Sequence, residues 1–221
     1  MADDILKRVG VVLLIVGLID IGVMIYCIMN DVSYSSSFNV FAVALGILLM
    51  RGSLRAASIV RFFGAFFLAS IIALVAAWPF LQPLGLTLAE LRHAAPLDIA
   101  RYLAFALFVV ALLFWTTLEL SQEAVLAALR ASGHSARALY MPSALGIGLV
   151  VAIGVGLVFL TGGETGTRAI NLAAQRLGPS YSYHVSSLHV TKTNQGTSVF
   201  GIVTAWNDVD IRNVPVAWKE R

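Results

Sequence analysis

Residues 142–161, PSALGIGLVVAIGVGLVFLT, decide the fold of this chain. The stretch holds no charged residue, and about 20 apolar residues cross the ~30 Å hydrocarbon core of a bilayer as a helix. A helix is required there because it satisfies its own backbone hydrogen bonds. The sequence before this stretch is mostly apolar, whereas the sequence after it is mostly polar. We therefore expect the last transmembrane helix here, with a soluble module attached to its C-terminal end.

Composition places the chain among multi-pass membrane proteins. Of its 221 residues, 59% are hydrophobic and 12% are charged, whereas an ordinary soluble domain carries about 25% charged residues. The net charge of +3 is not gathered in a basic run, so no nucleic-acid partner is expected. The single cysteine, Cys27, lies in an apolar run and excludes an internal disulfide or a CxxC pair.

Run length predicts a bundle of five transmembrane helices in residues 1–161. The expected spans are residues 9–29, 36–54, 62–81, 99–120 and 142–161. The second span is the weakest, because its apolar centre reaches spanning length only when flanking residues extend it. Between the third and fourth spans, Thr87 and Glu90 form a capping-box pattern that predicts a short interfacial helix, with a plain loop as the alternative.

Residues 162–221 are predicted to form a small α+β module. Residues 168–177 have helical periodicity, and three strand-like runs follow at 181–191, 197–206 and 211–218. The alternation changes phase at Ser186 and Ser187, which predicts a β-bulge. Pro215 predicts that the last strand lies at an edge. The fold class is thus a mostly α membrane protein carrying one helix on a three-stranded antiparallel meander.

The distribution of Lys and Arg predicts the orientation. With the N-terminus in the cytoplasm, the outer loops hold only Arg92 and Arg101. The inner flanks hold seven basic residues, Lys7, Arg8, Arg51, Arg55, Arg61, Arg130 and Arg137. Because cytoplasmic loops carry the excess of basic residues, we expect a cytoplasmic N-terminus and an extracytoplasmic, periplasmic C-terminal module. The plan suits a bacterial inner membrane.

Asp20 is a carboxylate near the middle of the first predicted span. An unpaired charge at the bilayer centre costs about 2.5–3.5 kcal/mol even on lenient insertion scales, and no Lys, Arg or His is expected at the same depth. Three outcomes stay open: Asp20 is protonated and hydrogen-bonded to a neutral group, it faces water, or it meets another polypeptide. Gly17 and Gly22 flank it and allow another helix to approach.

Two rows of small residues at four-residue spacing predict close helix packing, within the chain or against a partner. The first row, in the third span, is Ala65, Ala69, Ala73 and Ala77. The second row, in the last span, is Ala144, Gly148, Ala152 and Gly156. Because Ala and Gly are common throughout the chain, a chance row is the alternative.

The sequence offers no recognisable catalytic, cofactor or metal site. The four histidines lie outside the predicted spans, which argues against a membrane haem. His184 and His189 are five residues apart, on opposite faces of a strand unless a bulge intervenes. No phosphate-binding loop, GxSxG, HExxH or dinucleotide glycine motif is present. An enzyme is therefore the least favoured class.

Two classes of function remain. The first is a non-enzymatic accessory, assembly or scaffold subunit of a larger membrane complex, with membrane lipid and other integral membrane subunits, or further copies of itself, as partners. It accounts for a buried charge without an internal partner and for a module too small to build a large core. The alternative is a small oligomeric channel or a proton- or cation-coupled transporter that uses Asp20.

Overall fold

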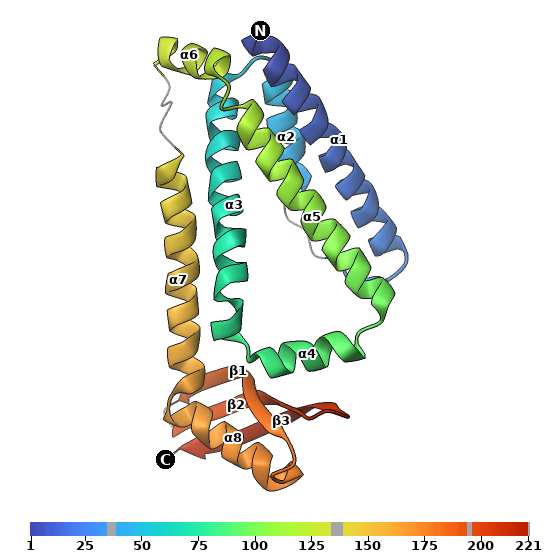
Figure 1. The fold of residues 1–221 in the computed structure, drawn as a ribbon, viewed down its shortest axis with the longest axis vertical. Helices are drawn as coiled ribbons and strands as arrows, with labels where there is room; N and C mark the ends of the chain where they lie inside the picture. Colours follow the sequence, from blue (N-terminus) through green and yellow to red (C-terminus); the bar gives the residue numbers. More distant parts are fainter. Residues whose placement is uncertain (35–38, 134–138, 194–195, 221) are drawn as a thin grey trace. The chain divides into compact units, whose positions relative to one another are not determined.

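The computed structural model describes residues 1–34, 39–133, 139–193 and 196–220. Within these ranges the chain forms eight helices followed by three strands (Figure 1). They belong to two compact units, one made of Met1–Ser70 and Ala106–Ile147 and the other of Ile71–Phe105 and Gly148–Arg221. Three of the long helices continue from one unit into the other.

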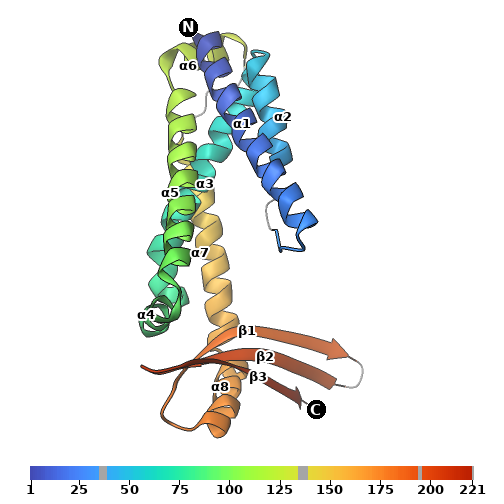
Figure 2. The same ribbon diagram turned by 90° about the vertical axis from the view of Figure 1, so that its right-hand side faces the viewer.

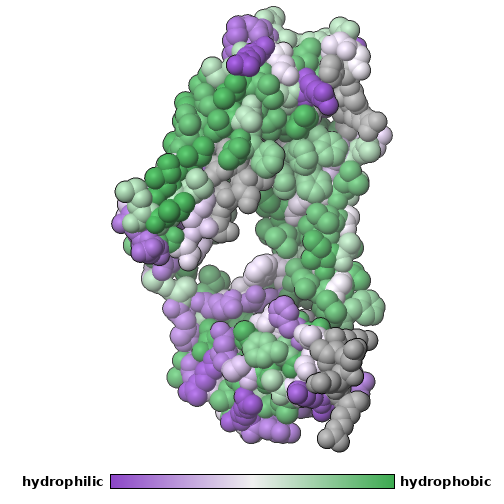
Figure 3. Space-filling model, turned by 180° about the vertical axis from the view of Figure 1, so that it is seen from behind, coloured by the Kyte–Doolittle hydropathy of each residue, from purple (hydrophilic) through white to green (hydrophobic). Residues whose placement is uncertain are grey.

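Four helices in the described part are long and apolar enough to cross a membrane. They are α1 (Ala2–Met29), α3 (Leu54–Leu81), α5 (Pro96–Glu119) and α7 (Tyr140–Gly162). The shortest, α7, has 23 residues, which at 1.5 Å per residue is about 35 Å and exceeds the ~30 Å hydrocarbon core. The surface over these helices is mainly hydrophobic (Figure 3). These features indicate a multi-pass membrane protein.

The second of the five expected spans is not shown by the structure. The helix in this place, α2 (Asn39–Met50), has 12 residues, and about 18 Å of helix does not cross the hydrocarbon core. Gly52 follows it with a left-handed φ of +76°, so the helix ends before residue 54. Residues 36–38 of the expected span lie outside the described residues. The described part therefore has four helices of spanning length rather than five.

The helices α1 and α2 run antiparallel (Figures 1 and 2) and meet backbone to backbone at two glycines. A Cβ added to Gly10 would lie 2.7 Å from the carbonyl oxygen of Gly46, and one added to Gly46 would lie 2.8 Å from that of Gly10. Small residues permit such an approach in membranes, where dispersion contacts hold helices together. At the end of this pair Gly52 lies beside Asp3, so α2 returns the chain to the N-terminal end of α1.

The core of the first unit joins α1, α2 and α3 to the end of α5 and to α6 (Glu123–Ala131). Its buried side chains are Ile5, Leu6, Val9, Leu49, Ala56, Ala57, Val60, Leu120, Val125 and Leu129. The structure separates α5 from α6 at Gln122, whose ψ is 144°. The break turns Val125 and Leu129 into the core.

Two more glycines give close contacts with α3. A Cβ on Gly64 would clash with the hydroxyl of Thr117 on α5, and a Cβ on Gly146 of α7 would clash with the carbonyl oxygen of Phe66. The Thr117 hydroxyl is buried and has no hydrogen-bond partner among the described residues. Four glycines thus form three close helix contacts within the first unit: Gly10 and Gly46 at α1–α2, Gly64 at α3–α5, and Gly146 at α3–α7.

In the second unit, α4 (Leu84–His93) follows the end of α3. Thr87 and Glu90 predict a helix start at Thr87, but α4 begins at Leu84 with Pro83 as its N-cap. Thr87 therefore lies inside the helix, where its hydroxyl accepts a hydrogen bond from the Trp78 indole nitrogen at 3.2 Å. The helix is confirmed, and the capping box is wrong.

The C-terminal strands form the antiparallel meander that the sequence predicts. α8 (Glu164–Leu177) precedes β1 (Ser182–Thr193), β2 (Gly196–Trp206) and β3 (Ile211–Glu220), in sheet order β1-β2-β3. The register shifts between Val185 and Ser187, which confirms the predicted bulge. Pro215 lies on the edge strand β3, opposite Ile202. The core between α8 and the sheet is Ala169, Ala173, Val185, Val203, Ala205, Val214 and Val216.

The glycine contact between α1 and α2 predicts a position-specific loss of stability. Gly46→Ala places a methyl group against the Gly10 carbonyl oxygen, and overpacking of this kind costs about 1–3 kcal/mol. Gly22→Ala is the matched control, because nothing lies within 4 Å of the added Cβ. The free energy of unfolding in detergent micelles should be lower for Gly46→Ala than for Gly22→Ala by this amount. Equal stabilities would contradict the backbone contact.

Candidate functional site

Asp20 has a neutral hydrogen-bond donor within the chain. The Tyr34 hydroxyl donates to Asp20 Oδ1 at 2.6 Å, a length typical of hydrogen bonds to a carboxylate. Tyr34 lies five residues beyond the end of α1, so the chain doubles back along α1 before α2 begins. The structure thus gives Asp20 a neutral hydrogen-bond donor, and the choice among the three outcomes left open by the sequence stays a prediction. Of the flanking glycines, Gly17 is buried and Gly22 is exposed.

The row Ala144, Gly148, Ala152 and Gly156 lies along an exposed face of α7. Nothing lies within 4 Å of a Cβ added to Gly148 or Gly156. The glycines that face the rest of the chain are instead Gly146, against α3 in the first unit, and Gly154, 3.5 Å from Leu81 in the second. Packing of the row against a partner stays a prediction.

The row Ala65, Ala69, Ala73 and Ala77 lies on the less exposed side of α3. Ala65 is buried and the other three are partly buried. The neighbouring Gly64 makes the close contact with Thr117 of α5. Whether the alanine row itself provides a contact with a partner stays a prediction.

Sequence reasoning missed the role of Arg61. Its side chain is 8% exposed, and Nε donates to Ser121 Oγ at 3.0 Å. The guanidinium thus links α3 to the turn between α5 and α6. Nearby, Arg8 of α1 pairs with Glu119 of α5 at 3.4 Å. In sequence both arginines look like flanking residues that mark the cytoplasmic side, and no local pattern reveals their long-range partners.

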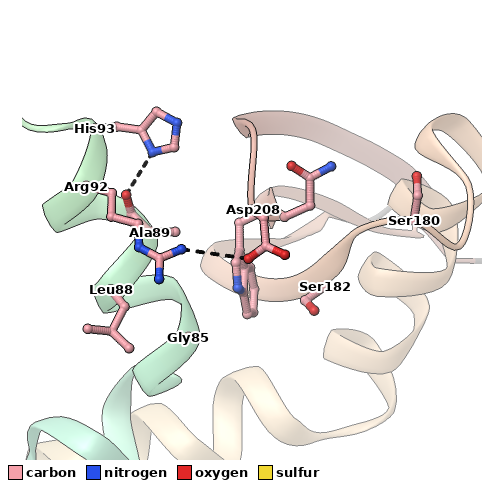
Figure 4. A pocket seen from close by; sticks show the side chains of 10 residues that line it. Gly85, Leu88, Ala89, Arg92, His93, Ser180, Ser182 and Asp208 are labelled. Atoms are coloured by element: carbon pink, nitrogen blue, oxygen red, sulfur yellow. Dashed lines mark hydrogen bonds and ion pairs between the residues drawn. The ribbon is translucent and has the colours of Figure 1, made fainter.

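A polar pocket of about 350 Å³ lies in the second unit between α4 and one end of the sheet (Figure 4). One wall is α4, with Gly85, Leu88, Ala89, Arg92 and His93. The other wall comes from Ser180, Ser182, Trp206, Asn207 and Asp208. The Trp206 indole nitrogen is 3.3 Å from the position of a Cβ on Gly85. Glycine at this position therefore lets the indole lie against α4.

Charges of both signs meet at the mouth of this pocket. Arg92 and Asp208 form an ion pair at 3.8 Å (Figure 4), and both side chains are well exposed, so the pair adds little stability. Together with two serine hydroxyls and the Asn207 amide, these groups can hydrogen-bond a small polar or zwitterionic molecule. The volume falls within the range of about 300–1,000 Å³ typical of small-molecule sites.

His93 joins α4 to the turn between β2 and β3. Its Nδ1 lies 2.8 Å from the carbonyl oxygen of Ala89, and its Nε2 lies 3.1 Å from that of Val209. A carbonyl only accepts, and a neutral imidazole donates from only one nitrogen, so both bonds form only in the imidazolium. The carbonyls of Ala89 and Val209 raise the pKa of His93, Asp210 adds to this effect, and desolvation and Arg92 oppose it.

The bulge in β1 places His184 and His189 on one face of the sheet, since their partners on β2 are Thr204 and Phe200. Burial lowers the pKa of His184, while Glu90 on α4 acts in the opposite direction. On the same face, Thr204 is buried and bonds to Ser186 and Asn213. Among the described residues, no group of three or more His, Cys, Asp or Glu side chains is placed to hold a metal ion.

The Asp20–Tyr34 hydrogen bond predicts an energetic coupling between the two residues. Tyr34→Phe should lower the free energy of unfolding in bicelles by about 1–2 kcal/mol, because a partly buried acceptor loses its donor. In an Asp20→Leu background the same substitution should have almost no effect. Tyr26→Phe is the control, because Tyr26 is an exposed residue of α1. Equal effects of Tyr34→Phe with and without Asp20 would contradict the pairing.

The two hydrogen bonds of His93 predict that the turn at residues 207–210 is held more firmly at acidic pH. Because the pKa of His93 in the folded protein is raised above 6.5, the stabilisation is complete below pH 6.5 and is lost as pH rises through the raised value. Hydrogen exchange, corrected for the intrinsic pH dependence, should show less protection of these amides at pH 8.5 than at pH 6.

The variant His93→Gln should make the protection of these amides independent of pH across this range. His189→Gln, on the exposed part of the sheet, should leave the wild-type pH dependence intact. The same pH dependence in the wild type and in His93→Gln would show that another group is responsible.

Neither a family model nor a curated protein nor a solved structure matches this chain. Three features of the chain bear on its function: an exposed small-residue face on α7, a hydrogen-bonded Asp20, and a polar pocket between α4 and the sheet.

Proposed function

We propose that this chain is a non-enzymatic accessory or scaffold subunit of a larger membrane protein complex. In this proposal the exposed small-residue face of α7, formed by Ala144, Gly148, Ala152 and Gly156, docks against a transmembrane helix of a partner or of a second copy. The observation that carries the proposal is that this face is exposed along its whole length in the described structure, with nothing within 4 Å of a Cβ on either glycine.

The chain's own helix contacts support this use of glycine. α1 meets α2 at Gly10 and Gly46, and α7 meets α3 at Gly146. In each case a missing Cβ permits contact between backbones, which in a bilayer provides the dispersion and weak hydrogen-bond energy that holds helices together. Gly148 and Gly156 offer a surface of the same kind on the part of α7 that the chain leaves exposed.

We further propose that the N-terminus is cytoplasmic and that α8 and the sheet lie outside the cytoplasm, at a bacterial inner membrane. The short α2 supports this orientation although it does not span by itself, because it brings the chain back to Asp3 and α3 starts from that side. α3, α5 and α7 then make three crossings. The excess of Lys and Arg at Lys7, Arg8, Arg51 and Arg55 favours the cytoplasm for the end where they gather.

The alternative proposal, a channel or transporter that uses Asp20, has less support. A membrane-buried carboxylate suggests a proton or ion pathway chiefly when nothing else accounts for it. The Tyr34 hydroxyl at 2.6 Å gives Asp20 a structural role, namely to hold the segment between α1 and α2 against α1. A scaffold needs no titrating group, so this pairing agrees with the proposed function.

The proposal predicts that bulk on the α7 face weakens assembly. Gly148→Leu combined with Gly156→Leu should lower the amount of membrane protein that copurifies in mild detergent about tenfold, which corresponds to a loss of about 1.4 kcal/mol. Val151→Leu combined with Val155→Leu is the control, because both valines are exposed on α7 but lie outside the row. A lone monodisperse monomer from wild-type membranes would contradict the proposal.

A further inference from the structure

The two faces of the sheet differ in what covers them. α8 packs on one face, where Ala169 and Ala173 meet the strand side chains and Arg168 lies 5.5 Å above the Trp218 ring. The strand register places a second set of residues on the opposite face. We call this the free face, and in the half of the sheet away from α4 it includes the apolar Phe200, Ile202, Pro215 and Ala217 together with the polar or charged Ser187, His189, Thr191, Ser198 and Lys219.

The free face combines exposed apolar side chains with polar ones and a lysine. The Phe200 side chain is 49% exposed, Pro215 and Ala217 beside it are exposed, and Ile202 is half-buried. Lys219 is exposed at the same end. No acidic residue lies on this face among the described strand residues. An aromatic ring flanked by a cation and lacking acidic neighbours is the chemistry that suits the headgroup region of an anionic bilayer.

The connection between α7 and the sheet keeps this face close to the membrane. α7 carries exposed apolar side chains as far as Phe159 and Leu160, and α8 begins at Glu164 after a single N-cap residue, Gly163. In Figure 2, α7 reaches the sheet from above, near β1, and α8 lies lower. The short tether therefore holds the sheet at a high effective concentration beside any bilayer that α7 crosses.

We propose that the free face rests on the anionic headgroup layer of the membrane that α7 crosses, with Phe200 at the depth of the lipid interface and Lys219 paired with lipid phosphates. Contact with the lipid removes the Phe200 ring from water. The electrostatic part acts over about 10 Å at 0.1 M salt, so it depends on lipid charge and ionic strength. The proposal concerns a lipid surface, and it is independent of the α7 docking face.

The test measures the depth of a spin label at Ala217 on the free face. The full-length protein carries Cys27→Ser and Ala217→Cys and is reconstituted in vesicles of phosphatidylglycerol and phosphatidylcholine. Accessibility to oxygen relative to a water-soluble nickel chelate should be at least threefold higher for this label than for one at Asn171→Cys, which is exposed on α8. Vesicles of phosphatidylcholine alone, or 1 M salt, should reduce the ratio.

Two substitutions identify the groups responsible. Phe200→Ser should remove most of the difference between the two labels, whereas Val190→Ser, an exposed apolar residue on the α8 side of the sheet, should preserve it. Equal access of water to both labels in anionic vesicles would overturn the proposal. Protection of the label at 217 from both reagents in native membranes, with full water access in vesicles, would overturn it in favour of a protein partner on this face.

Discussion

The structure depends on one constraint: backbone polar groups cannot be left unpaired in hydrocarbon. Long helices meet this requirement by themselves, so their side chains are left to decide how the helices pack. In this chain the helix packing is set by glycines, which have no side chain. Gly10, Gly46 and Gly146 sit where a Cβ would collide with a neighbouring backbone, and the arrangement of α1, α2, α3 and α7 within the first unit follows from those contacts. A helix face without such a contact, such as that of Gly148, faces lipid or a partner.

The short α2 and the Asp20 carboxylate lie at the two ends of one connection. If the second helix had full length, the residues beside Asp20 would be helical. Their hydroxyl groups would then bond to the backbone of their own helix or contact lipid. α2 begins at Asn39, and Tyr34, which precedes it, donates its hydroxyl to Asp20. The feature that removes the fifth expected span therefore also supplies the donor that the sequence did not reveal.

Sequence predicted those parts of the fold that depend on local pattern. Apolar run length located four long helices, and alternation with its phase change located the strands and the bulge at Val185 and Ser187. Local pattern could not show which glycines make helix contacts. Gly146 and Gly148 are two residues apart, which on a helix places them on nearly opposite faces. Every glycine-rich span contains several equally spaced rows of small residues. Contacts such as that between His93 and Val209 join distant residues and leave no trace in local periodicity.

The small size of the sheet gives the membrane a structural role. One helix on three strands buries a thin core, and the three strands leave β1 and β3 as edges. α4 covers one end of the second face, through Gly85 beside Trp206, and leaves the half that carries Phe200. Exposure of the Phe200 ring to water is unfavourable, whereas a lipid headgroup layer accommodates both this ring and the Lys219 ammonium. In our proposal the lipid surface supplies the second layer for this sheet, which a short connection tethers to α7.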